Sequence, residues 1–169
     1  MSESLENVKV PDVVGEIIGW RAWKIEGTPQ FPQLHSATWA SHWKPWTWTV
    51  AECNGSLTCS RSHDGRCPGE DCRCGMYAAA SRVQLVDLGY NDFHTLSSKV
   101  VIGQVGLAGK VIPGDQGWRA EKARVVKLYV PHLFGELVEP LRRIYRCEVV
   151  TDNTFDHREP HEREWSRAS

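Results

Sequence analysis

A segment between residues 53 and 74 gathers the side chains that are best suited to chemistry. It holds five of the six cysteines of the chain and one histidine: Cys53, Cys59, His63, Cys67, Cys72 and Cys74. The other residues of the segment are largely glycine, proline, aspartate and serine, which is a composition typical of loops. Such a set of side chains can serve as a disulfide framework, as a catalytic thiol or as a metal site.

The spacing of these side chains favours a structural zinc site. Structural zinc ions are held in a tetrahedron by Cys thiolates and His nitrogens, and a loop of small polar residues needs such an ion because it cannot build an apolar core. Cys53 ends the apolar segment "WTWTVAEC" and Cys74 precedes the next apolar run, so ligands at both positions tie the loop at its two ends. Gly75 permits the bend that a C-x-C pair requires. The predicted Zn²⁺ ligands are Cys53, His63, Cys72 and Cys74, with Cys59 and Cys67 as alternates and Cys67 as the first candidate to displace His63.

The N-terminal residues bear on whether these cysteines form disulfides. Met1–Val10 is polar and acidic, and it has neither the basic start nor the apolar run of a signal peptide. No apolar stretch of about eighteen residues, the length needed to span a membrane, occurs in the chain. We therefore predict a cytoplasmic protein without membrane contact, in which thiols are kept reduced. Six cysteines are compatible with disulfides, but this compartment favours the metal site.

Catalytic uses of the same residues are the alternatives. A catalytic zinc ion, as in a zinc-dependent hydrolase or deaminase, keeps an open coordination position beside a general acid or base. The zinc deaminases of nucleobases carry H-x-E followed by P-C-x-x-C, whereas here Gly65 stands two residues after His63 and Pro68 precedes a glycine. Cys147 lies outside the segment, in "IYRCEVV", and is predicted to be a buried apolar residue.

The cysteine pattern and the sequence after it resemble a known set of proteins. The pattern C…H…C-x-C-G-[aliphatic]-Y-A begins at Cys53, and "IGQVGLAGKVI", "GWRAEKA" and "LYVP" come after it. Together they resemble uncharacterised small zinc-binding-like proteins of actinobacteria and their phages, over roughly residues 11–131. The resemblance implies the ligands Cys53, His63, Cys72 and Cys74, because Cys59 and Cys67 lie outside its pattern. It implies no activity.

The rest of the chain must position these ligands. Runs of β-branched and aromatic residues predict strands at 13–25, 98–112, 118–130 and 147–150, with a turn at 113–117. A helix is predicted over 76–89, and a second helix begins after Pro131 and kinks near Pro140. The predicted fold class is α+β, mainly antiparallel β in a small barrel or sandwich, with one or two short helices and a zinc-stapled loop.

We expect three parts along the chain: a flexible lead at 1–10, a single zinc-stabilised domain at 11–150 and a charged tail at 151–169.

Tryptophan is unusually frequent, with eight residues in a chain of 169. Trp39 and Trp43 have polar neighbours, so we expect their rings to be partly exposed, and exposed tryptophans anchor binding partners. The strings "GWRAWK" at 19–24 and "GWRAEK" at 117–122 echo one another and place an arginine beside each tryptophan. The predicted binding residues are Trp39, Trp43, Trp46, Arg21 and Arg119.

These features predict a non-catalytic binding module with a structural zinc site. The net charge of −1 provides no general field for a polyanion, so a protein partner is favoured. The first alternative is a nucleic-acid reader that stacks an unpaired or modified base on tryptophan. It requires basic residues grouped around the tryptophans on one face, namely Arg21, Arg119, Lys44 and Lys110. The second alternative is a zinc-dependent hydrolase or deaminase.

Overall fold

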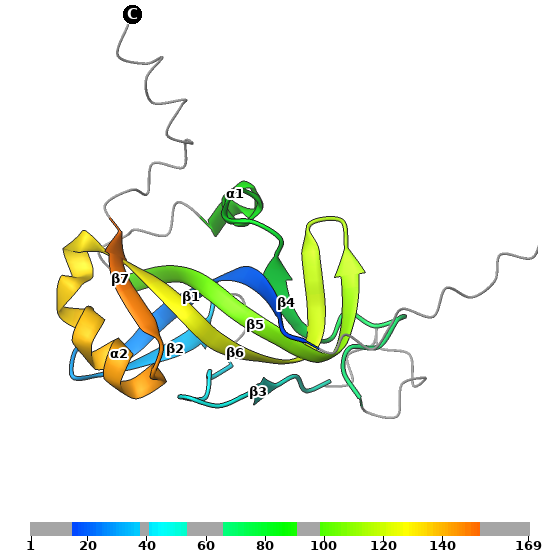
Figure 1. Cartoon of the computed structure of the whole chain (residues 1–169), viewed down its shortest axis with the longest axis horizontal. Helices are drawn as coiled ribbons and strands as arrows, with labels where there is room; N and C mark the ends of the chain where they lie inside the picture. The colour runs from blue at the N-terminus through cyan, green and yellow to red at the C-terminus, as the bar shows by residue number, and fades with distance from the viewer. Residues whose placement is uncertain (1–14, 38–40, 54–65, 91–98, 153–169) are drawn as a thin grey trace, which may run out of the picture.

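A mixed sheet of seven strands forms the body of the described part of the protein (Figure 1). The computed structural model describes residues 15–37, 41–53, 66–90 and 99–152. The strands are β1 (Ile17–Thr28), β2 (Phe31–Ser36), β3 (Thr49–Val50), β4 (Met76–Ala79), β5 (Lys99–Gly114), β6 (Gly117–Pro131) and β7 (Glu148–Asp152). Their order across the sheet is β2-β1-β4-β6-β3, and β5 pairs with β1 and β6 while β7 pairs with β6.

The hairpin of β5 and β6 is the longest unit of the sheet. Both strands are rich in valine, which favours the pleated conformation, and a turn at 115–116 joins them. The pairing shifts register between Gln104 and Val105 and again between Ala108 and Val111. Bulges of this kind bend a strand and increase its twist, and the hairpin tip accordingly turns away from the rest of the sheet (Figure 1).

The predicted α+β class with mainly antiparallel strands is confirmed. All strand pairs are antiparallel except that of β6 with β7, which makes the sheet mixed. β4 pairs with β6 over four residues but with β1 only at Trp20 and Ala79. Because β1 and β4 are joined by this single residue pair, the sheet does not close into a barrel.

Two short α-helices accompany the sheet. They are α1 (Arg82–Leu85), which continues into the π-helical turn η1 (Val86–Tyr90), and α2 (Val138–Tyr145), which comes after the 3₁₀ turn η2 (His132–Leu137). The predicted helix over 76–89 is wrong at its start, because residues 76–79 form β4 and the helix begins after Ser81. The Ser81 side chain caps it by accepting a hydrogen bond from the backbone N–H of Gln84.

The predicted kink at Pro140 is also wrong. Pro140 lies in the first turn of α2, where a backbone N–H has no intrahelical partner and proline is therefore tolerated. The irregular residue is Phe134, whose non-helical backbone interrupts η2 six residues earlier.

Two apolar clusters occupy opposite faces of the sheet, since neighbouring residues of one strand contribute to different clusters. The larger cluster lies between the sheet and the η2–α2 segment and contains Trp23, Leu128 and Leu141. The smaller cluster contains Ala22 and lies beneath α1, whose Leu85 packs into it. Among the described residues, no helix combines the length and the apolar character that a membrane crossing requires.

Candidate metal centre

The register of the sheet brings both ends of the cysteine loop to one place. β3 and β4 pair with neighbouring residues of β6 on the edge that does not pair with β5, and both run antiparallel to it. Just after β3, the Ala51 N–H donates to the Glu121 carbonyl of β6 at 2.8 Å. The first residue pair of β4 with β6 joins Met76 to the neighbouring Ala120. Cys53 leaves β3 and Cys74 enters β4 next to the same two residues of β6. Two segments that are far apart in the chain therefore meet there.

The cysteine sulfurs converge at this point. The Sγ atoms of Cys53, Cys72 and Cys74 all lie within 4.8 Å of one another, which is close enough to hold a metal ion. Four sulfurs at about 2.3 Å from a tetrahedral zinc ion are about 3.8 Å apart, and the Sγ atoms of Cys53 and Cys72 are 3.8 Å apart. The Cys74 sulfur also accepts a hydrogen bond of 3.3 Å from the Gly69 N–H, as metal-bound thiolates commonly do.

Cys67 lies beside this group, although its sulfur is not among the three that lie within 4.8 Å of one another. It is buried, and burial, together with hydrogen bonding to Cys74 and Cys53 and their charge, raises the pKa of the Cys67 thiol to about 12. The sequence indicates Cys67 as the first alternate to His63, whereas His63 and Cys59 lie outside the described residues. The histidine ligand therefore stays a prediction, and Cys67, which interacts with Cys53 and Cys74, is the fourth candidate among the described residues.

The oxidation state of one ligand differs from the sequence prediction. Cys53, Cys67 and Cys74 carry thiols, whereas Cys72 is in a disulfide. A thiolate ligand at Cys72 exists only after this bond has been reduced, so the structure links metal binding to the redox state of the cluster.

Arg119 holds the cysteine loop against the sheet. Its side chain extends from β6, and its Nη1 donates hydrogen bonds to the carbonyl oxygens of Cys72, Cys74 (3.2 Å) and Gly69 (3.3 Å). The same loop contains a turn in which the Cys72 N–H donates to the Gly69 carbonyl at 3.3 Å. The guanidinium group thus fixes the backbone from which two candidate ligands project, and it places a positive charge beside a site that thiolates would make negative.

The echoed "GWRA" strings have a common structural role. Gly19 of β1 and Gly117 of β6 flank β4, and a Cβ atom at either position would collide with Ala78, at 2.6 Å from its Cβ for Gly19 and 2.0 Å from its carbonyl oxygen for Gly117. The arginine of each string then donates to carbonyls of the 69–77 segment: Arg119 to the three in the cysteine loop, and Arg21 to Tyr77. The two copies of the string therefore have the same role: one copy in β1 and one in β6 hold β4 from its two sides.

Two of the predicted binding residues contact one another, with the Arg21 Cζ 5.0 Å from the centre of the Trp43 ring. Trp43 is only 1% exposed and packs edge-on against Trp23, with ring centres 5.3 Å apart, so the expectation that it is partly exposed is wrong. Arg21 and Arg119 donate to carbonyls within the protein, and burial lowers the pKa of Arg21 to about 10. Trp46 is 62% exposed and stays a predicted binding residue, and Trp39 lies outside the described residues.

Sequence reasoning finds the cysteine cluster but not the residue that positions it. Arg119 is marked in the sequence only by its repeated string, and spacing offers no means of linking it to a loop some fifty residues earlier. Cys147 packs at the edge of the larger apolar cluster, partly buried and outside the group of sulfurs, which agrees with its predicted apolar role.

Comparison of the chain with known protein families, with curated proteins and with solved structures finds no match. The resemblance to zinc-binding-like proteins of actinobacteria and their phages stays a prediction.

Proposed function

We propose that the protein is a non-catalytic binding module, in which a structural zinc ion staples the sheet and Trp46 is presented to a macromolecular partner. The observation that supports the ion is the convergence of the Cys53, Cys72 and Cys74 sulfurs within 4.8 Å. Sulfur ligands favour zinc over magnesium or calcium. With Cys67 as the fourth ligand, the coordination shell would be closed, which is typical of structural rather than catalytic zinc sites.

A zinc ion at this place would join the end of β3 to the start of β4, which follow one another along one edge of β6. β3 contributes only two residues to the sheet, so its attachment depends largely on the segment after it, which leads to Cys53. In the reduced protein the ion would hold the short strand β3 against β6, where its two residues alone form few hydrogen bonds. The segment 41–53, which carries Trp46, would then be fixed at its far end.

Metal analysis of the full-length protein, purified under a reducing agent, tests the proposal. We expect about one zinc ion per chain, and we expect chelation to unfold the edge of the sheet. Cys72→Ser is expected to lower the zinc content, and Cys147→Ser serves as the matched control that leaves it unchanged. Full zinc content in Cys72→Ser, or iron or no metal in the reduced wild type, would contradict the proposal.

A second pair of variants identifies the fourth ligand. Cys67→Ser and His63→Ala each remove one candidate, and only the loss of a true ligand should lower zinc affinity strongly. Loss of affinity in Cys67→Ser alone favours the four-cysteine site, and loss in His63→Ala alone favours the ligand set that the sequence predicts.

A further inference from the structure

Trp46 and Arg146 contact one another in an unusual backbone setting. They are the two non-glycine residues with positive φ in the described part of the chain, at 52° and 50°. The left-handed conformation is costly for residues that carry a Cβ atom. At Arg146 it ends α2, and the Arg146 N–H donates to the Arg142 carbonyl at 2.9 Å. The Arg146 Cζ lies 3.9 Å from the centre of the Trp46 ring, so one guanidinium group stacks on one indole at the surface.

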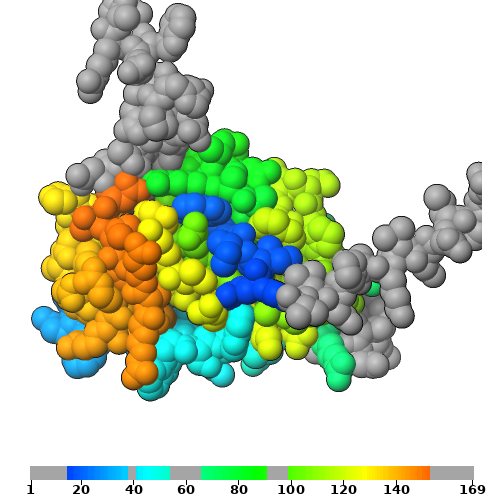
Figure 2. Space-filling view, in the orientation of Figure 1, coloured from blue at the N-terminus to red at the C-terminus, as the bar shows by residue number. Residues whose placement is uncertain are grey.

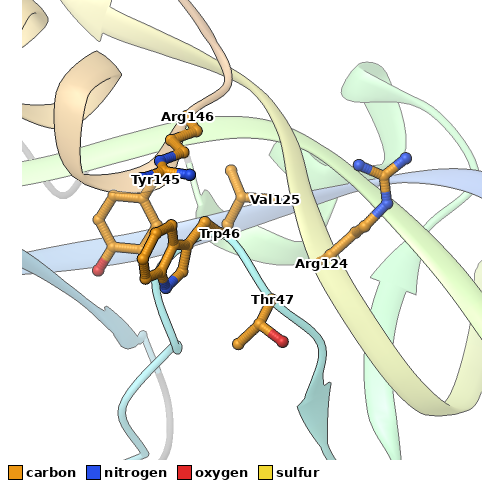
Figure 3. Close-up of a pocket in the computed structure, with 6 residues that line it drawn as sticks. All are labelled: Trp46, Thr47, Arg124, Val125, Tyr145 and Arg146. Atoms are coloured by element: carbon orange, nitrogen blue, oxygen red, sulfur yellow. The ribbon is translucent and has the colours of Figure 1, made fainter.

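These two residues line a pocket at the edge of the sheet. The pocket has a volume of about 150 Å³, and its walls are Trp46, Thr47, Arg124, Val125, Tyr145 and Arg146 (Figure 3). Figure 3 shows Trp46, Tyr145 and Arg146 together on one side, with Arg124 on the other side beyond Val125. The Tyr145 hydroxyl is fixed by bonds to the Leu34 N–H at 2.8 Å and to the Trp43 carbonyl at 3.3 Å, so this wall is held in place by the core.

A second aromatic ring with cations lies two residues along the chain. The Lys122 Nζ is 5.3 Å and the Arg124 Cζ 5.7 Å from the centre of the Trp48 ring. In the space-filling view the 41–53 segment, coloured cyan, runs along the lower edge of the molecule next to the orange end of α2 and β7 (Figure 2). The surface therefore repeats one unit, a tryptophan with a cation over its face.

The charge of this surface is largely uncompensated within the described residues. Arg124 is paired with Glu16, with its Nε 2.6 Å from a carboxylate oxygen. No ion pair of Lys122 or Arg146 with a described residue is found. An anionic ligand would meet two cations without displacing an acidic side chain, and a third after exchange with Glu16.

We propose that this surface binds single-stranded nucleic acid. A single strand presents planar bases and phosphate groups in alternation, which matches rings and cations that alternate in space. An unpaired base would stack on the exposed face of Trp46, while Arg146, Lys122 and Arg124 contact phosphates. The inference rests on the proposed function as a binding module and names its partner. It uses a surface different from the one expected from the sequence, where Arg21 and Arg119 were to supply the charge.

Fluorescence anisotropy with labelled single-stranded DNA and RNA of about 15 nucleotides tests the inference on the reduced, zinc-loaded full chain. We expect binding at about 50 mM salt that weakens as salt rises, with a slope of log K against log salt of about −2 for three phosphate contacts. Trp46→Ala should weaken binding about 5- to 150-fold, and Trp46→Phe should retain most of it because the ring is kept. A duplex of the same sequence should bind more weakly, because its bases are already stacked.

Two further variants separate binding from folding. Arg146→Gly removes the guanidinium group while supplying the residue that a left-handed backbone favours, so we expect a folded protein with weaker binding and a shallower salt dependence. Phe31→Ala, which removes another exposed aromatic ring (69% exposed) outside the pocket, should bind like the wild type.

The outcomes distinguish this inference from the zinc proposal. Absence of binding at low salt, or binding that Trp46→Ala and Arg146→Gly leave unchanged, overturns it. Binding of an acidic peptide in place of the oligonucleotides overturns it in favour of a protein partner. Zinc content measured on the same samples decides the other question, because full zinc content without nucleic-acid binding leaves the zinc-stapled module standing.

Discussion

Replacement of Arg119 tests whether the sheet positions the metal centre through the backbone of the cysteine loop. Its Nη1 faces the carbonyls of Gly69, Cys72 and Cys74, but it carries only two N–H groups, so it forms two full bonds at a time. A bond from a charged donor contributes at least about 1.5 kcal/mol, which gives about 3 kcal/mol for the pair. Arg119→Ala should therefore weaken zinc binding about 100-fold, and Arg119→Lys, which keeps one bond, about 10-fold.

Competition with a chromophoric chelator under reducing conditions measures this effect. Arg124→Lys is the matched control, since Arg124 lies on the same strand and pairs with Glu16 rather than with the loop. If Arg119→Ala bound zinc with wild-type affinity while remaining folded, the loop would not depend on β6 for its shape, and the positioning role of Arg119 would be refuted.

Three further changes probe the scaffold by chemical denaturation. Trp23→Ala empties a fully buried position of the larger core and should cost about 3–5 kcal/mol in the free energy of unfolding. Gly117→Ala places a Cβ atom 2.0 Å from a β4 carbonyl oxygen and should destabilise the protein by at least about 2 kcal/mol, whereas Gly135→Ala, which meets nothing within 4 Å, should have little effect. Tyr145→Phe leaves the Leu34 N–H without its acceptor and should cost about 1–3 kcal/mol; an unchanged stability would show that water replaces the hydroxyl.

Strands that are marked by their own residues could be predicted from the sequence. The valine-rich runs at 98–112 and 118–130 correspond to β5 and β6, because β-branched residues between turn signals favour the same structure locally and in the fold. β4 is predicted as part of a helix because its alanines have a high intrinsic helix propensity. Its strand conformation comes from the narrow space between Gly19 and Gly117, which admits only small side chains and is formed by segments about forty to sixty residues away.

In the candidate sites, too, local features could be predicted from the sequence and contacts between distant segments could not. Clustering of cysteines in one loop is visible in the sequence, so Cys53, Cys72 and Cys74 could be chosen from spacing. The polar neighbours of Trp43 suggest exposure, but its burial depends on Trp23 in a distant strand. The pairing of Trp46 with Arg146 likewise depends on how α2 ends, one hundred residues later, and no local pattern indicates it.

The place of β6 in the chain sets the order in which this protein can be completed. Every candidate ligand between residues 53 and 74 leaves the ribosome before β6, the strand that aligns them, has been made. Early in synthesis the thiols are therefore gathered on an unaligned loop, and they are exposed to metal capture or oxidation until the hairpin of β5 and β6 arrives. The supply of reductant and zinc during translation, rather than afterwards, would then decide which form of the cluster the finished sheet encloses.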